Sequence, residues 1–253
     1  MSMFRSDSSL PRLGKLPAGK SAVISVLDVG SSKICCMIAR LKPCEGSEML
    51  PGRSHTIEVL GIGHQRSLGI KSGVVVNMDE AEKAIRLAVD SAERQASMTV
   101  DSLIVSVSAG RLSSATCSSD IDLGGREVRR ADISAVLAAG FAHTQQEGRI
   151  PVHALPIGFA LDSERGIASP EGMVGNNLAV DMQIVTADAA PLRNIELCVN
   201  RAHLSVDGMV ASPYASGLSA LVEDEARMGA ACVDMGGGTT SVSIFFNGNL
   251  WRV

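Results

Sequence analysis

Two short segments of the chain combine an aspartate, a glycine and small polar residues at the same spacing. The residues of the first segment are Asp28, Gly30, Ser31, Ser32 and Lys33. Those of the second, in the same order, are Asp234, Gly236, Gly237, Gly238, Thr239 and Thr240. Apolar and β-branched residues flank each segment, which predicts a strand, a tight turn and a second strand. The chain therefore contains one turn motif twice, about 200 residues apart.

Each turn supplies the groups that a nucleoside triphosphate with its Mg²⁺ requires. Glycine lets backbone N–H groups come close to a phosphate, because it has no side chain. The hydroxyl groups and Lys33 add donors, and Asp28 and Asp234 are the candidates for holding Mg²⁺, mainly through water. One Asp-x-Gly turn is common in ordinary hairpins, but two aligned turns indicate a phosphate site with two sides. Other nucleotide motifs fail, since Gly61-x-Gly63 is followed by Arg66 where a third glycine would be needed.

Composition limits the class of protein. The 253 residues suffice for one large domain or two ordinary ones, and 45% are hydrophobic but only 3% aromatic. Such a core of aliphatic residues favours layered α/β packing. The net charge of −4 gives no reason to expect nucleic acid as a partner. Six cysteines without a CxxC pair predict free thiols, and five scattered histidines show no metal-ligand spacing.

The elements that would position the turns follow from periodicity. Residues 1–20 have the composition of a tail and 42–56 of a surface loop. A strand is predicted over 57–63, and a turn followed by another strand over 69–76. A helix is expected over 80–96, capped by Asp79 with Glu82 in support. Its core-facing residues would be Ala81, Ala84, Ile85, Ala88, Val89 and Ala92.

The remaining elements can be predicted in the same way. Expected strands cover 102–123 in two pieces, 150–161, 178–186 and 204–210, with a loop at 165–177. Expected helices cover 131–143, 191–203 and 213–223. Asn247-Gly248 is a strong hairpin signal that joins the last two strands. Because a sheet should continue beyond one hairpin, we expect the sequence to be the N-terminal part of a longer protein.

These motifs resemble those of the actin-like ATPase superfamily. Asp28–Lys33 resembles its first phosphate motif, Asp234–Thr240 its second, and 206–220 the connecting strand and helix. The middle of the chain is similar to one member family, the bacterial cell-division proteins of the FtsA family. The segments that carry this similarity are 67–78, 106–111, 152–156 and 170–173, in the same order as in that family.

The resemblance implies an α/β protein with the actin-like, ribonuclease H-like ATPase fold, an inserted subdomain called 1C, and a truncated second lobe. Lobe I, or subdomain 1A, would comprise residues 21–97 and 180–228. Subdomain 1C would comprise 98–179, and 229–253 would begin lobe II, or subdomain 2A. Residues 1–20 would be a disordered tail.

The resemblance also implies a function. Members of the family bind ATP with Mg²⁺ between the lobes and polymerise, with 1C taking part in self-association and in recruiting later divisome proteins. They anchor the FtsZ ring to the cytoplasmic face of the inner membrane at the division septum, as peripheral membrane proteins. The FtsZ-binding subdomain and the membrane-binding amphipathic C-terminal helix would lie beyond Val253, so this chain alone is expected to be soluble.

Two features depart from the family pattern. Arg129 and Arg130 precede the expected helix at 131–143, where positive charges oppose the helix dipole. Three explanations are open: another residue caps this helix, the two arginines face a binding partner, or they are simply a solvated pair of charges. The helix at 213–222 offers no glutamine or acidic residue to orient an attacking water, so we expect slow ATP hydrolysis or none and assign no catalytic residue.

Three other interpretations remain. A PilM-like protein of pilus assembly shares the superfamily and the 1C-like insertion. A sugar kinase of the same superfamily would need a catalytic carboxylate near the connecting segment, for which Asp207 is the nearby candidate. A chaperone ATPase domain would lack the middle region found here.

Overall fold

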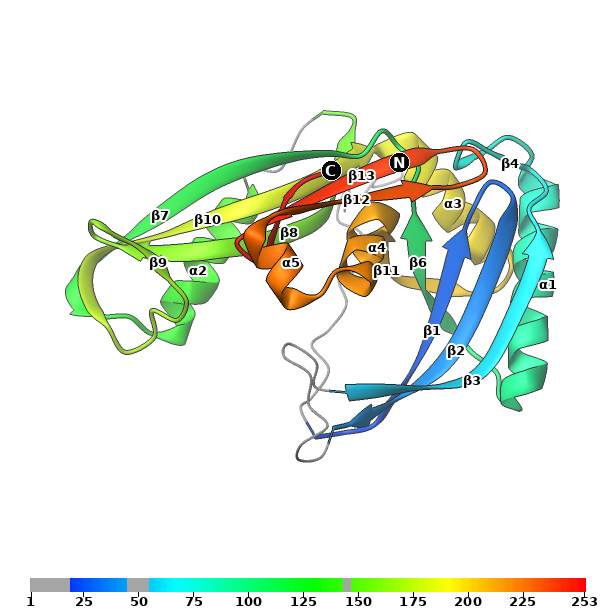
Figure 1. The fold of residues 1–253 in the computed structure, drawn as a ribbon, viewed down its shortest axis with the longest axis horizontal. Coiled ribbons are helices and arrows are strands. Elements are labelled where there is room, and N and C mark those ends of the chain that lie inside the picture. The colour runs from blue at the N-terminus through cyan, green and yellow to red at the C-terminus, as the bar shows by residue number, and fades with distance from the viewer. Residues whose placement is uncertain (1–18, 45–54, 143–146) are drawn as a thin grey trace, which may run out of the picture.

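A computed structural model describes residues 19–44, 55–142 and 147–253. The predicted tail at 1–20 and the loop at 42–56 therefore lie mostly outside the described residues. The described chain forms two larger sheets, a three-stranded sheet near the C-terminus and a short hairpin. Below, the part built on the five-stranded sheet is called lobe I, and residues 113–188 are called the insert. Figure 1 shows the insert at one end of the molecule, lobe I at the other, and the three-stranded sheet lying across both.

The five-stranded sheet forms the centre of lobe I. Its order is β11-β6-β1-β2-β3, with β1, β6 and β11 parallel and β2 and β3 antiparallel to their neighbours. The strands are β1 (Ala22–Val29), β2 (Lys33–Pro43), β3 (His55–Arg66), β6 (Ser102–Val107) and β11 (Ser205–Ala211). Parallel strands β1 and β6 end together, which brings the first turn beside the residues that follow β6.

Helix α1 (Met78–Ala96) packs on this sheet with the face that its sequence predicts. All six predicted core residues of the helix are buried. Its N-cap is Asn77 rather than Asp79, because the Asn77 Oδ1 accepts hydrogen bonds from the backbone N–H groups of Asp79 and Glu80, both at 3.2 Å. The predicted cap was therefore wrong by two residues. Helix α3 (Ala189–Arg201) contacts α1 and completes this layer.

The insert is a second sheet with its own core. Its order is β7-β10-β8-β9, formed by β7 (Ser113–Glu127), β8 (Arg149–Leu161), β9 (Glu164–Ile167) and β10 (Val174–Asp188). Strand β9 lies in the stretch predicted to be a loop. Helix α2 (Arg130–Ala142) packs on β7 and β10. The boundaries between the insert and lobe I, judged by which sheet each strand joins, lie near residues 108 and 188 rather than at the expected 98 and 179. The first lies later because β6 pairs with β1 of lobe I, and the second because β10 continues to Asp188.

The start of α2 shows how its arginines are accommodated. Asp132, in the first turn, accepts hydrogen bonds from the Arg129 backbone N–H at 2.9 Å and from both Nη atoms of Arg126 at 2.6 Å. These contacts, the Arg126 hydrogen bond foremost, hold the pKa of the Asp132 carboxyl well below its usual value. Arg130 donates to the Glu171 carboxylate at 2.8 Å on the surface. The cap therefore differs from the expected one, with the aspartate placed inside the helix.

One arginine ties together the places where the chain enters and leaves the insert. Arg149 donates from Nε to the Thr186 hydroxyl at 3.0 Å and from Nη1 to the Asp188 carboxylate at 2.5 Å. Its Nη2 donates to the carbonyl oxygens of Arg111 at 2.8 Å and Thr186 at 2.9 Å. The planar guanidinium suits such a set of fixed acceptors.

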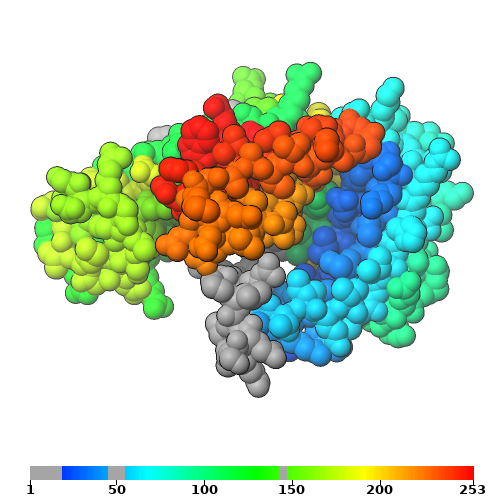
Figure 2. All heavy atoms as spheres, in the orientation of Figure 1, coloured from blue at the N-terminus to red at the C-terminus, as the bar shows by residue number. Residues whose placement is uncertain are grey.

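The last part of the chain packs between the two sheets. It comprises α4 (Ser212–Ala220), α5 (Glu223–Met228), β12 (Ala230–Met235), β13 (Thr240–Phe246) and β14 (Asn249–Arg252). Asn247 and Gly248 have φ values of 51° and 77°, as the predicted hairpin turn requires. The Gln183 amide of the insert donates to the Trp251 carbonyl at 2.8 Å. In Figure 2 this hairpin covers the junction between insert and lobe I.

No helix in the described ranges is long and apolar enough to cross a membrane.

Candidate functional site

The two predicted turns have the same backbone geometry. The Gly30 N–H donates to the Lys33 carbonyl at 3.1 Å, and the Gly236 N–H donates to the Thr239 carbonyl at 2.9 Å. In β1–β2, Asp28 lies opposite Cys35, and in β12–β13, Asp234 lies opposite Ser241, seven residues on in each case. The repeat seen in the sequence is therefore also a repeat of hairpin structure.

The turns face and touch each other. A Cβ placed at Gly237 would lie 2.8 Å from the Cβ of Ser32, and one placed at Gly238 would lie 2.7 Å from the Ser31 hydroxyl. Figure 1 shows the β12–β13 turn reaching over the end of β1 and β2. Only glycine permits this approach. A polyphosphate between the turns would require the β12–β13 hairpin to move away from lobe I.

The charge of Asp234 acts on Asp28 across this contact. Burial raises the pKa of Asp28 above its usual value; a hydrogen bond from Ser106 lowers it, the charge of Asp234 raises it and that of Lys33 lowers it. Asp28 and Asp234 are therefore near enough for like-charge repulsion, as expected of two groups that would share one cation. Lys33 is exposed beside Asp28, and Thr240 is exposed at the start of β13.

Four serines that sequence reasoning missed complete this region. The hydroxyls of Ser106 and Ser212 are 2.8 Å apart, and the Ser216 hydroxyl donates to Asp234 Oδ2 at 2.7 Å. The Thr239 hydroxyl donates to Ser108 Oγ at 3.3 Å. Ser106 could have been found from the fold, because ligands of open α/β sheets bind beyond the carboxyl ends of parallel strands.

A third turn joins the site from the short hairpin β4 (Ile70–Lys71) and β5 (Val74–Val75). The Gly73 N–H donates to the Ser31 hydroxyl at 2.9 Å. Ser72 and Gly73 have φ values of 49° and 74°, so both central residues of this turn are left-handed. The sequence predicts a turn and a strand there, but not its contact with Ser31.

Asp207, the candidate carboxylate for a sugar kinase, lies elsewhere. It accepts a hydrogen bond from Ser102 at 2.5 Å, at the beginning of β6 and β11. Asp28 pairs with Ser106, near the other end of β6. The geometry therefore gives no support to Asp207 as a group acting at the turns.

Metal clusters and thiol pairs are not features of the described chain. Within it, no group of three or more histidine, cysteine, aspartate or glutamate residues could hold a metal ion by itself. All six cysteines are free, as predicted. Two carboxylates with phosphate and water oxygens would nevertheless suit Mg²⁺, which is seldom enclosed by protein ligands alone.

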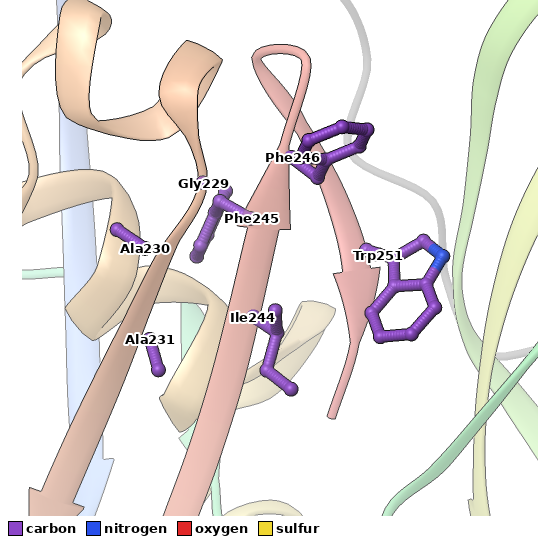
Figure 3. A pocket seen from close by; sticks show the side chains of 7 residues that line it. All are labelled: Gly229, Ala230, Ala231, Ile244, Phe245, Phe246 and Trp251. Carbon is purple, nitrogen blue, oxygen red and sulfur yellow. The ribbon is translucent and has the colours of Figure 1, made fainter.

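Figure 3 shows a pocket that is separate from the turns. It has a volume of about 530 Å³, and Phe246 of β13 and Trp251 of β14 are among the residues that line it. Its lining is apolar, and it includes neither carboxylate. It is therefore not a candidate for phosphate binding.

His153 of β8 links the insert to α4. Its Nε2 accepts a hydrogen bond from the Ala211 backbone N–H at 3.0 Å, and its ring lies edge-on to Tyr214 with centroids 4.9 Å apart. Burial lowers the pKa of His153 from 6.5 to about 4. The imidazole is therefore neutral in the folded protein at neutral pH, and the junction depends on that neutrality.

We expect this histidine to make stability depend on pH. The unfolded chain binds a proton at His153 below about pH 6.5, but the folded chain binds it only near pH 4. The contribution of the neutral imidazole to the free energy of unfolding is therefore fully present above pH 6.5, and it is lost as the pH falls from 6.5 to 4. The loss attributable to His153 should be about 2 kcal/mol at pH 5. Urea unfolding of the wild type and of His153→Gln, at pH 7.5 and pH 5, measures it. Equal losses in the two proteins would contradict the assignment.

Comparison with known proteins places this geometry in a class. In a solved structure titled "PilM-PilN type IV pilus biogenesis complex", one chain superposes with a TM-score of 0.55 and 12% identity, covering 90% of this chain and 59% of that one. The fold is that of the actin-like ATPases, as the two turn motifs predict. Residues 109–186 match the model described as the SHS2 domain inserted in FtsA.

Proteins named cell division protein FtsA match nearly the whole chain. The protein from Rhizobium meliloti is 57% identical over 251 residues, which are 99% of this chain and 57% of that protein. The one from Pseudomonas aeruginosa is 34% identical over 93% of this chain and 54% of its own length. The chain belongs to the FtsA family, and it spans about half the length of these relatives. This identity also separates it from PilM, with which it shares the fold.

Proposed function

We propose that the protein to which this chain belongs is an ATP-binding cell-division protein that works at the division septum. The observation that carries the nucleotide part is the pair of matching turns, which face each other with one carboxylate each. The names of the relatives support the cell-division part.

The residues at the turns fit Mg²⁺ and ATP. Gly30 and Gly236 close the two turns with their own N–H groups, and Gly237 and Gly238 let a phosphate approach the backbone. Ser31, Ser32, Lys33, Thr239 and Thr240 add side-chain donors. Asp28 and Asp234 would hold Mg²⁺, which offsets their repulsion when it is bound. Hydrolysis should be slow or absent, because α4 presents serines to the turns and no glutamine or acidic side chain.

Binding of ATP to the full-length protein tests this proposal. Asp28→Ala and Gly236→Val should each weaken Mg²⁺-dependent ATP binding at least about tenfold, because one removes a carboxylate and the other fills the turn. Gly158→Ala, at a position in the insert where a Cβ would meet only the Gly166 Cα at 3.9 Å, is the control. Isothermal titration in the presence of Mg²⁺ gives the affinities. Unchanged affinity in both variants would count against the site.

The partners belong to the same proposal. Self-association into filaments would involve the insert, which also would recruit later divisome proteins. Anchoring of the FtsZ ring to the cytoplasmic side of the membrane would depend on segments of the longer protein. The family match supports these roles. Colocalisation of the full-length protein with FtsZ at septa of dividing cells, and its loss from the membrane fraction when the end of the protein is deleted, would test them.

A further inference from the structure

The geometry points to Ser212 and Ser216 of α4 as positioning residues that hold the two carboxylates in place for a divalent cation. This inference rests on the proposed nucleotide site and names residues that the turn motifs do not include. Ser216 reaches Asp234 directly, while Ser212 reaches Asp28 through Ser106.

The two serines lie on one side of the helix. Residues four apart in an α-helix are neighbours on its surface, so Ser212 and Ser216 present their hydroxyls together. The Ser212 hydroxyl is linked through Ser106 to Asp28 of lobe I. The Ser216 hydroxyl bonds directly to Asp234, which follows α5. Helix α4 therefore touches both halves of the proposed cation site.

The helix itself is firmly placed. A Cβ at Gly217 would lie 2.2 Å from Cε2 of Phe245, so the helix backbone packs closely on β13. On the same helix, Tyr214 packs against His153 of the insert. Because α4 is fixed from two sides, its hydroxyls restrict where the carboxylates can lie. Removing one hydroxyl should free its carboxylate to adopt other rotamers.

The alternative is that the serines only satisfy a polar junction. A junction role would affect folding and all nucleotide binding, whether or not a divalent cation is present. A positioning role would affect the Mg²⁺-dependent part alone. The Mg²⁺ requirement of nucleotide binding therefore separates the two roles.

The experiment titrates Mg²⁺ into full-length protein with a ribose-labelled fluorescent ATP and repeats the binding in EDTA. Ser216→Ala should raise the Mg²⁺ concentration for half-maximal binding about tenfold, as expected for one hydrogen bond to a charged group. Binding in EDTA should change less than twofold. Ser216→Thr keeps the hydroxyl and should restore most of the Mg²⁺ response. Ser219→Ala is the matched control, because its hydroxyl donates to the Ser216 carbonyl and to neither carboxylate.

The outcomes separate the inference from the proposal on which it rests. If the wild type binds labelled ATP and Ser216→Ala needs no more Mg²⁺ than Ser219→Ala, the inference is wrong. Equal weakening with Mg²⁺ and in EDTA shows a junction role and also overturns it. A wild type that binds no nucleotide under either condition overturns the proposed function itself. Thermal unfolding of each variant shows which losses reflect unfolding.

Discussion

Replacing Gly63 with alanine should lower the free energy of unfolding by about 3 kcal/mol or more, at the upper end of the cost of overpacking. A Cβ at this position would lie 1.9 Å from the Ala88 carbonyl oxygen and 2.7 Å from the Ala92 nitrogen. Both are backbone atoms of α1, so no side chain can turn away to make room. To accommodate the methyl group, either α1 moves away from β3 or β3 bends. Urea denaturation of the wild type and of Gly63→Ala measures the difference in the free energy of unfolding.

The control for this prediction is Gly158→Ala on β8. A Cβ there would meet only the Gly166 Cα, at 3.9 Å, which is an ordinary contact. The same substitution should change stability by no more than about 1 kcal/mol, because its main effect is on the unfolded chain. Similar losses at Gly63 and Gly158 would show that α1 does not pack on β3 through bare backbone.

The second large effect is expected from Phe245→Ala. Phe245 is 2% exposed and shares a cluster with Val185 of the insert, Ala211 of lobe I and Leu250 of β14. Removing a buried phenyl ring costs about 3–5 kcal/mol. Because this cluster joins three parts of the molecule, the loss should appear first as faster hydrogen exchange in β12–β14. Hydrogen exchange followed by mass spectrometry resolves these strands from the rest.

The adjacent residue provides the matched control. Phe246 is 53% exposed, and it lines the pocket shown in Figure 3. Phe246→Ala removes the same group from the same strand but leaves the Phe245 cluster intact. It should change stability by less than about 1 kcal/mol. Equal effects of the two substitutions would mean that the hairpin does not pack on the insert and lobe I through Phe245.

Local patterns in the sequence predicted the parts of the fold that depend on neighbours along the chain. The period of α1 identified its buried face because a helix repeats within four residues. The two Asp-x-Gly turns were recognisable because each hairpin closes on itself. Asn77 was missed as the N-cap because Asp79 and Asn77 are both good caps, and only the backbone shows which one precedes the first turn.

Other features depend on contacts between distant segments, which no local pattern encodes. The insert boundaries depend on which sheet each strand joins, so β6 was assigned to the wrong side. The contact of Ser31 with Gly73 joins residues 42 apart, and that of Ser106 with Ser212 joins residues 106 apart. These serines have no signature of their own, because serine is common in loops and at helix starts. They can be found only once the order of the strands is known.

The clamp formed by Arg149 has a mechanical consequence. Two connections join the insert to lobe I, and a single guanidinium fastens both of them at the Arg111 carbonyl, Thr186 and Asp188. Strand β10 ends at Asp188, and α3 begins at the next residue, Ala189. A pulling force on the far end of the insert would therefore be transmitted along β10 to α3. Because both connections are fixed in this way, the insert and lobe I should move together, and a force on the far end of the insert should be transmitted to lobe I.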